Sequence, residues 1–187
     1  MAGVYEYMSK KYKVHNPEGS YFMTLTIVGW IDVFSRQLYR DILLESLRYC
    51  QQHKGLLLYA YVVMTNHVHL IAAVQEGHDL VETIRSLKKY TAKQMLEAIA
   101  KEPESRREWL LYLLSYFGKQ VKQAHQVWQH DNHPIELWSE AVIRQKLDYL
   151  HWNPVRAGFV EAPEQWVYSS ASNYLYGKGV LEVLVPE

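Results

Sequence analysis

The sequence predicts a single domain of the α+β class, and three observations support this prediction. Uniformly apolar stretches rich in aromatic and β-branched residues, typical of strands, alternate with longer stretches whose apolar residues recur at helical spacing. The chain has 187 residues, which is enough to bury one core but short for two domains. Hydrophobic residues make up 49% of the chain, a fraction typical of folded globular proteins.

In the first half of the chain the pattern predicts a strand, a helix and then a hairpin of two strands. A polar leader, residues 1–20, precedes residues 21–30, whose aromatic and β-branched side chains predict a strand. Residues 35–50 predict a helix, because apolar side chains recur at helical spacing among charged ones. Residues 56–64 are uniformly apolar and predict a buried strand. Residues 67–74 predict a third strand, and the two-residue break before them indicates a hairpin.

The second half of the chain predicts two helices with irregular sequence between them. Residues 79–101 predict a long helix, because their apolar side chains recur at helical spacing and the stretch begins with an aspartate that can cap a helix. Residues 104–126 are less regular, and residues 127–129 predict a short strand. Residues 139–153 predict the last helix, because a serine and a glutamate precede apolar residues at helical spacing. The tail after this helix is expected to be loop-like.

This succession is the ferredoxin-like βαββαβ order with an added C-terminal helix. We therefore expect an antiparallel sheet with helices on one face, plus the C-terminal helix. The domain boundaries that follow are a leader over residues 1–20, one domain over residues 21–160, and a tail over residues 161–187.

The bulk composition limits the classes of function. The 20 basic and 20 acidic residues balance, so a nucleic-acid contact has to be local. Cys50 is the only cysteine, which excludes an intramolecular disulfide and a cysteine-rich zinc site and fits a reducing compartment. The sequence has no signal-peptide pattern and no membrane-spanning stretch, so we expect a cytoplasmic protein without a membrane partner. Among 15 tyrosines and 6 tryptophans most are expected to fill the core, although aromatic rings also stack on unpaired bases.

His67 and His69 are the first candidates for chemistry. They stand two residues apart in a predicted strand, where side-chain direction has a period of two, so both imidazoles project from the same face. Two histidines make a bidentate metal platform that leaves coordination positions open, as catalysis requires. The alternative interpretation is that they are partly buried polar residues of a sheet, and the spacing alone leaves both open.

Tyr149 and Asn153 are the second pair of candidates. They lie four residues apart at the end of the last predicted helix and therefore share one helix face, where a nucleophile and a third metal ligand can meet. Pro154 disfavours helical conformation at Asn153, so we expect Asn153 to reach the site from a frayed last turn if the helix ends early. Taken alone, these residues equally fit a core tyrosine and a helix-capping asparagine.

A basic face on the long second helix is the candidate for phosphate binding. It consists of four residues that lie within about two turns of one another: Arg85, Lys88, Lys89 and Lys93. Such a run is more often a solvated helix face. Tyr90 lies inside it and competes with Tyr149 for the role of nucleophile. The chain contains no glycine-rich phosphate loop, GxSxG motif or HExxH motif.

Three segments together resemble a known family. They are YVVMTNHVHLIAAV (residues 61–74), KLDYLHWNPVRAGFV (residues 146–160) and WVYSSASNY (residues 166–174). The combination resembles the single-tyrosine HUH transposases, also called IS200-like transposases, and within them the REP-associated tyrosine transposases (RAYT). The resemblance extends over most of residues 21–176 and leaves residues 104–126 as an apparent insertion.

The resemblance implies a metal-dependent enzyme that cleaves and rejoins single-stranded DNA containing a hairpin through a covalent 5′-phosphotyrosine. It assigns the metal ligands to His67 and His69, the nucleophile to Tyr149 and the third ligand to Asn153. The implied cofactor is Mg²⁺ or Mn²⁺, since mixed imidazole and amide ligands suit these ions. The Asn-Pro pair is the REP-associated pattern and favours hairpin processing over a self-mobile element.

The resemblance leaves two oligomeric states open, because one branch forms dimers that exchange tyrosine helices and the other can act as monomers. Two other functions also stay open at this point. One is a family-derived DNA-binding protein without catalytic activity. The other is a metallohydrolase in which water attacks, which needs an acidic ligand or base near the histidines.

Overall fold

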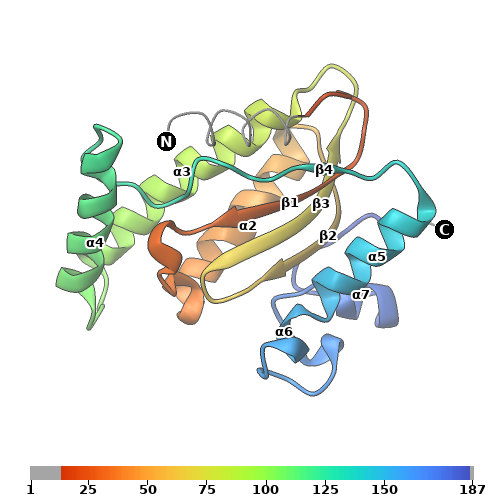
Figure 1. Ribbon diagram of the computed structural model, residues 1–187. Helices are drawn as coiled ribbons and strands as arrows, with labels where there is room; N and C mark the ends of the chain where they lie inside the picture. The colour runs from red at the N-terminus through yellow and green to blue at the C-terminus, as the bar shows by residue number, and fades with distance from the viewer. Residues whose placement is uncertain (1–13, 186–187) are drawn as a thin grey trace, which may run out of the picture.

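The structure is a computed structural model of the chain, and it describes residues 14–185 (Figure 1). The elements follow in this order: β1 (Tyr21–Thr26), η1 (Val28–Trp30), η2 (Val33–Ser35), α2 (Gln37–His53), β2 (Leu56–Val63), β3 (His67–Val74), α3 (Leu80–Lys101), α4 (Arg107–Gln120), β4 (Ile135–Glu136), α5 (Glu140–His151), α6 (Asn153–Arg156), η3 (Pro163–Gln165) and α7 (Ala171–Tyr176). Within residues 14–185, no helix combines the length and the apolar character needed to cross a membrane.

The four strands form one antiparallel sheet in the order β2-β3-β1-β4. The predicted hairpin is the β2–β3 pair, and β1 pairs with β3 over its whole length, from Tyr21 opposite Ala72 to Thr26 opposite His67. This is the strand order of the ferredoxin-like fold, so the fold class predicted from the sequence is confirmed.

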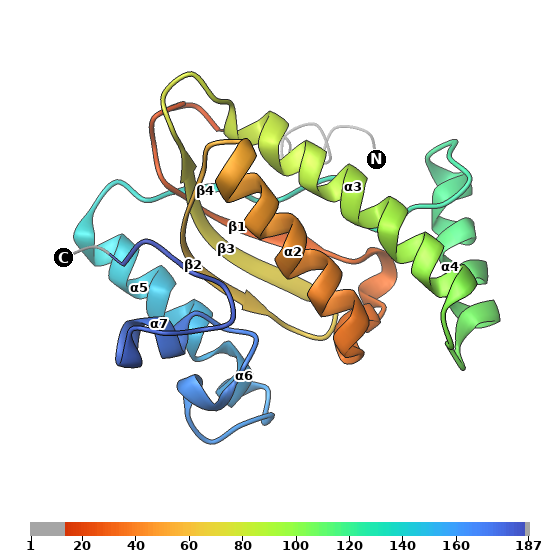
Figure 2. The ribbon, with the colours of Figure 1, turned by 180° about the vertical axis from the view of Figure 1, so that it is seen from behind.

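The two faces of the sheet are covered differently. Helices α2 and α3 lie together over one face, which is turned toward the viewer in Figure 2, and enclose the larger core with Met23, Leu25 and Leu70 of the strands. Helix α5 lies over the other face, seen in Figure 1, where Phe22 and Leu150 belong to a second, smaller core. Because side chains alternate along each strand, β1 and β3 contribute to both cores.

Local capping explains where the two predicted long helices begin. The Asp79 carboxylate accepts a hydrogen bond from the backbone N–H of Glu82 at 3.0 Å, at the start of α3. The Ser139 hydroxyl accepts one from the N–H of Val142 at 3.4 Å, at the start of α5. Such caps each contribute about 1 kcal/mol, which is why both starts were readable from the sequence.

Two predicted strand boundaries are wrong. The first strand ends at Thr26, not at residue 30, because residues 28–30 turn into the short helix η1. Residues 127–129 form only an isolated bridge, in which Trp128 pairs with Ile27, and the fourth strand is β4 at residues 135–136. Both differences arise from pairing between segments about 100 residues apart, which no local pattern encodes.

The less regular stretch of residues 104–126 contains the 14-residue helix α4. Its inner face buries Leu110 and Leu114 in the larger core, one turn apart. Its outer face carries large aromatic residues, Trp109, Tyr112 and Tyr116, all exposed. The apolar character of both faces obscured the helical periodicity in the sequence.

The C-terminal tail is more regular than predicted and belongs to the same domain. Ser169 bridges to Val62 of β2, and the N–H of Ser170 donates to the carbonyl of Tyr61 at 2.9 Å. The short helix α7 lies in the stretch that was expected to be loop-like, and Leu181 is buried in the larger core. The tail therefore covers the free edge of β2.

A buried carboxylate connects α2 to the start of α4. Glu104 accepts hydrogen bonds from the Arg36 guanidinium at 3.0 Å, the Tyr39 hydroxyl at 2.8 Å and the backbone N–H of Arg106 at 3.0 Å. Burial by itself raises the pKa of Glu104, but these hydrogen bonds, first that of Arg106, outweigh it and lower the pKa below its ordinary value.

We expect Glu104→Ala to lower the free energy of unfolding by about 2 to 3 kcal/mol, because the buried Tyr39 hydroxyl loses its acceptor and the Arg36 guanidinium loses its counter-charge. Since the folded-state pKa is lowered, the carboxylate stabilises the fold at neutral pH and stops doing so as the pH falls through that lowered value. Urea unfolding should therefore show a gap between wild type and Glu104→Gln that narrows in acid. A gap that is constant with pH would contradict this assignment.

Candidate active site

His67 and His69 project from β3 on the face that α5 covers. Their ring centroids lie 4.7 Å apart, as expected for two residues of one strand that point to the same side. His69 is only 4% exposed, whereas His67 is half-buried at the edge of the site. The Phe22 ring stacks on the His69 ring with a centroid distance of 5.2 Å. The pair therefore lies at the border of the smaller core.

Each imidazole is held through its Nδ1 atom. His67 Nδ1 lies 2.7 Å from Asn66 Oδ1, an acceptor, which places the ring proton on Nδ1. His69 Nδ1 lies 2.9 Å from the hydroxyl of Thr24, the residue opposite it on β1. With Nδ1 protonated, His67 Nε2 carries a lone pair. In His69 the Thr24 hydroxyl can donate to Nδ1 or accept from it, and Nε2 lies beside the Asn153 amide. A hydrogen bond at the second ring nitrogen is the outer contact found around metal-ligating histidines.

Both histidines are neutral at neutral pH. Burial first, and then the neighbouring His67 and Lys146 as positive charges, lower the pKa of His69 to about 3. Burial also lowers the pKa of His67. Because only the neutral imidazole has a lone pair to donate, this protonation state is the one that a metal requires.

Helix α5 brings Tyr149 to the histidine pair. Its ring centroid lies 5.3 Å from that of His69 and 5.9 Å from that of Phe22, and the side chain is 41% exposed. The next residue, Leu150, is fully buried in the smaller core and holds this turn of α5 against the sheet. The tyrosine is thus open to solvent on one side and packed against the histidine on the other, within one copy of the chain.

Asn153 reaches the same histidine from the first residue of α6. Its Nδ2 lies 3.3 Å from His69 Nε2. Helix α5 ends at His151, as the proline suggested, but the chain does not fray: the N–H of Arg156 still donates to the carbonyl of Trp152 at 3.0 Å. Pro154 is accommodated in the first turn of α6, where its missing N–H costs little.

The described residues 14–185 hold no cluster of three or more histidine, cysteine, aspartate or glutamate side chains. The amide of Asn153 is thus the group that the structure adds to the histidine pair.

Two cations that the sequence analysis did not single out flank the tyrosine. Lys146 Nζ lies 5.9 Å from the centroid of the Tyr149 ring and 5.2 Å from that of Phe22. The guanidinium of Arg156 lies 5.7 Å from the Tyr149 ring. Lys146 precedes the tyrosine by three residues, a spacing that places both on one helix face and could have revealed it. A chain with no net charge therefore concentrates positive charge at this tyrosine.

The predicted basic face lies on α3, across the sheet from this site. Arg85 forms an ion pair with Glu82, and Lys93 lies 3.9 Å from Glu97. Lys89 is exposed. The structure thus does not bring these residues together with the histidines or with Tyr149.

Lys88 does not belong to an open face with them. Its ammonium donates to the carbonyls of Gln129 and His130 at 2.5 and 3.1 Å and to Asn132 Oδ1 at 2.7 Å, and burial lowers its pKa to about 8. All three protons have acceptors, so Lys88 stabilises the loop that leads to β4.

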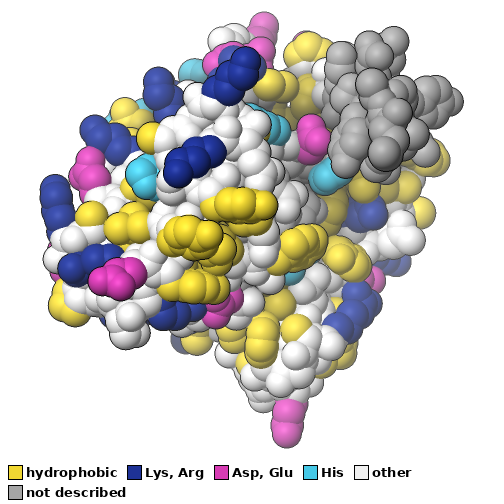
Figure 3. All heavy atoms as spheres, turned by 60° about the vertical axis from the view of Figure 1, so that its left-hand side comes forward, with side chains coloured by type: hydrophobic (Ala, Val, Ile, Leu, Met, Phe, Trp, Pro, Cys, Tyr) yellow, Lys and Arg dark blue, Asp and Glu magenta, His cyan; other side chains and the backbone are white. Residues whose placement is uncertain are grey.

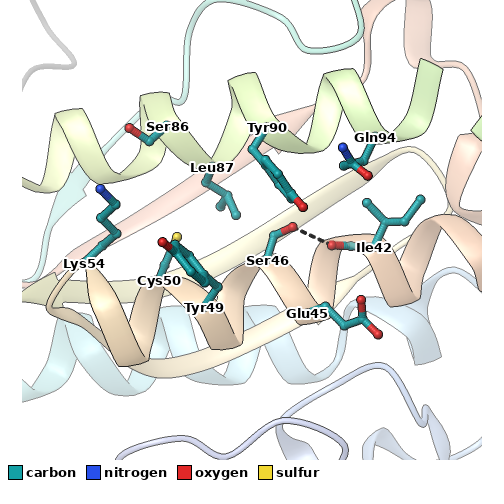
Figure 4. A pocket seen from close by; sticks show the side chains of 10 residues that line it. All are labelled: Ile42, Glu45, Ser46, Tyr49, Cys50, Lys54, Ser86, Leu87, Tyr90 and Gln94. Carbon is teal, nitrogen blue, oxygen red and sulfur yellow. Dashed lines mark hydrogen bonds between the residues drawn. The ribbon is translucent and has the colours of Figure 1, made fainter. Parts of the chain in front are cut away.

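The competing tyrosine, Tyr90, also lies on the α3 side of the sheet. It lines a groove of about 530 Å³ between α2 and α3, together with Tyr49, Ser46 and Cys50 (Figure 4). This hollow is on the opposite side of the sheet from the histidine pair. Tyr149 packs against a histidine of the pair, whereas Tyr90 lies on the far side of the sheet from both histidines.

Comparison with known families assigns the chain to one of them. The family model described as transposase IS200-like matches residues 30–130, which is more than half of the 187 residues. The chain belongs to the IS200-like transposase family. The matched range contains both histidines and ends before Tyr149.

Two solved structures are similar to the chain. The chain is similar to a REP-associated tyrosine transposase bound to a REP hairpin, with a TM-score of 0.64 and 18% identity over 94% of both chains. At this identity the similarity establishes a shared fold. A putative transposase from Deinococcus radiodurans R1 matches at a TM-score of 0.46 and 20% identity, over 73% of this chain and 92% of that one. No curated protein matches the sequence.

The Lys88 contacts generate a prediction about stability. We expect Lys88→Met to lower the free energy of unfolding by about 1 to 3 kcal/mol, because three oxygen acceptors lose a charged donor. The neighbouring exposed Lys89 is the matched control, and Lys89→Met should change stability by less than about 0.5 kcal/mol. Urea denaturation of both variants measures the difference. Equal midpoints for the two would mean that the ammonium does not hold the loop.

Proposed function

We propose that this transposase is a metal-dependent single-stranded DNA endonuclease and strand transferase that acts on hairpin-containing DNA through a covalent 5′-phosphotyrosine. The observation that carries the proposal is the packing of the Tyr149 ring against the His69 ring at 5.3 Å, beside a second histidine and an amide. A nucleophile next to a pair of neutral imidazoles is the arrangement that metal-assisted phosphoryl transfer needs.

The donor set fits a divalent metal. His67 and His69 would hold it through Nε2, since their Nδ1 atoms are engaged by Asn66 and Thr24. Asn153 would contribute its amide oxygen after its amide turns over, since Nδ2 is the atom that faces His69 Nε2. Mixed nitrogen and oxygen ligands suit Mn²⁺ or Mg²⁺ completed by water and phosphate oxygens. When bound, such an ion neutralises a non-bridging phosphate oxygen and lowers the electrostatic barrier to attack.

The chain's own residues carry the bond-making steps. The Tyr149 hydroxyl oxygen attacks the scissile phosphorus, forming the Tyr149 O–P bond, and the bond from phosphorus to the 3′-oxygen breaks. The phenol loses one proton and the departing 3′-oxygen takes one up, so protons balance. A 3′-hydroxyl of another strand reverses the step, with the phenol as a competent leaving group.

Lys146 and Arg156 bind the phosphate from the tyrosine side. Their positive charges lie within 6 Å of the Tyr149 ring centroid. A cation near the reacting phosphate stabilises the negative charge that crowds there in the transition state. The phosphate is thereby held between these cations and the histidine face.

The substrate class follows from charge and from the structural neighbour. A chain without net positive charge has little nonspecific affinity for duplex DNA, so recognition relies on local contacts. The transposase that shares this fold is described as bound to a REP hairpin. We accordingly propose a DNA hairpin with adjoining single strand as substrate. Arg85, Lys89 and Lys93 would contact phosphates away from the cleaved bond, because α3 lies across the sheet from Tyr149.

A single experiment separates this proposal from its competitors. A hairpin oligonucleotide is incubated with the protein and Mn²⁺ and resolved on a denaturing gel. A covalent adduct supports the tyrosine mechanism. Cleavage without an adduct favours attack by water, and binding without cleavage favours a DNA-binding protein that lacks activity. Either of the last two results would overturn the proposal.

We expect Tyr149→Phe to abolish the adduct while leaving hairpin binding and metal binding unchanged, because only the hydroxyl is lost and the ring still packs on His69. Tyr90→Phe is the matched control and should form the adduct at the wild-type rate, since Tyr90 lies on the other side of the sheet. Peptide mass spectrometry of the wild-type adduct checks the assignment. A modified peptide that lacks Tyr149 would refute it.

We also expect His67→Ala to abolish measurable Mn²⁺ binding and Thr24→Val to weaken it about 10- to 100-fold, because the Thr24 hydroxyl contacts His69 Nδ1 and orients the ring. Titration calorimetry of the DNA-free protein gives the affinities. Thr26→Val, the same change two residues along β1 and opposite His67, is the control and should bind Mn²⁺ as wild type does. Unaltered affinity in Thr24→Val would show that this contact does not orient the ligand.

A further inference from the structure

Trp30 has an unusual backbone and side-chain environment next to the histidine pair. Its φ is 56°, in the left-handed region that bulky residues rarely adopt. Its side chain is nevertheless 61% exposed. The indole ring meets the His67 ring edge-on, with centroids 5.9 Å apart and planes at 71°. A strained, exposed tryptophan thus lies in contact with a candidate metal ligand.

The surrounding structure enforces this conformation. Gly29, just before it, also has a positive φ of 61°, and a Cβ atom there would come within 2.5 Å of the Phe117 ring of α4. The Asn66 side chain donates through Nδ2 to the Trp30 carbonyl at 3.3 Å and accepts through Oδ1 from His67 Nδ1 at 2.7 Å. One amide therefore holds both the tryptophan backbone and the orientation of the histidine.

Burial does not explain why a tryptophan occupies this position. Most of the indole is exposed to water, so burying it stabilises the fold only slightly. This gain offsets little of the free energy that the left-handed backbone costs. A glycine would adopt the same φ without strain. Strained residues of this kind concentrate where ligands bind. An exposed indole next to a site for DNA phosphate matches the flat faces of unpaired bases.

We propose that Trp30 is the stacking platform for an unpaired base of the DNA strand whose phosphate lies at the histidine pair. This inference rests on the proposed function, and it adds a binding residue that positions the strand. The Trp30 ring touches His67, so a base stacked on it lies within about one or two nucleotides of the phosphate, given the length of one nucleotide step. Stacking is tolerant of base identity, because every base has an aromatic face.

Helix α4 continues the aromatic surface away from the site. Its Phe117 packs against Gly29, next to Trp30, and Tyr116 meets Phe117 edge-on with a centroid distance of 5.4 Å. Tyr116 and Tyr112 are 53% and 69% exposed. Figure 3 turns this end of the molecule forward, and hydrophobic side chains gather there with Lys and Arg side chains beside them. A strand that leaves Trp30 in this direction meets further rings on which to stack.

The test measures binding alone, in a Tyr149→Phe background that carries out no cleavage. The probe is a synthetic DNA hairpin with oligo(dT) extensions of about ten nucleotides at both ends, and its affinity is measured by fluorescence anisotropy. A series of otherwise identical probes carries one abasic nucleotide at each extension position in turn. Three variants are compared, Trp30→Ala, Trp30→Phe and Trp30→Gly. The matched control is Trp138→Ala, since Trp138 is 78% exposed and lies between β4 and α5.

We expect Trp30→Ala to weaken binding of the tailed hairpin about 5- to 100-fold and to leave a tail-free hairpin unaffected, with Trp30→Phe close to wild type. At one or two neighbouring positions, an abasic nucleotide should weaken the wild-type protein but not Trp30→Ala, the coupling expected of two groups in contact. Trp30→Gly should bind as weakly as Trp30→Ala while its melting temperature is no lower than that of wild type, because glycine relieves the strain. Trp138→Ala should show no such coupling.

Equal weakening of tailed and tail-free hairpins, or coupling at no abasic position in a protein that binds the tailed strand, would overturn the stacking role. The transposase proposal would survive that result if the wild-type adduct still forms. A wild-type protein that neither binds the tailed hairpin nor forms an adduct would overturn both.

Discussion

The arrangement of the site depends on one buried imidazole. His69 contacts Thr24 on the neighbouring strand through Nδ1, Asn153 of α6 through Nε2, and the rings of Phe22 and Tyr149 through its own ring. The sheet, the helix of Tyr149 and the Asn153 amide therefore meet at a single neutral side chain. Because both of its nitrogens have partners, burying it in the smaller core leaves no unsatisfied polar atom, which would otherwise be costly.

The sheet has the larger core on one face and the candidate active site on the other. Alternation along β1 and β3 sends apolar side chains to the larger core beneath α2 and α3 and sends the histidines to the face beneath α5. Charge is divided in the same way. On α3, Lys88 is used to hold a loop, whereas Lys146 and Arg156 place their charges at Tyr149. A chain with no net charge thus has a local concentration of positive charge on the face that carries the histidines.

Much of this was readable from short-range patterns. The same-face geometry of His67 and His69 follows from strand periodicity alone, and the capping residues Asp79 and Ser139 marked the starts of α3 and α5. The order of strands and helices was sufficient for the ferredoxin-like class, because that order leaves few topologies open. Such features depend on residues within one or two helical turns, so the sequence by itself determined them.

Only the tertiary structure decided which distant residues share an environment. The bridge from Trp128 to Ile27 and the hydrogen bonds of Lys88 join segments about 40 to 100 residues apart, and no local periodicity encodes them. The surroundings of Trp30 likewise come from afar, since the Asn66 amide binds its carbonyl and the Phe117 ring packs against Gly29 beside it. Local sequence sets the direction of a side chain, whereas long-range packing sets what that side chain meets, and the second is what turns a histidine pair and a tyrosine into one site.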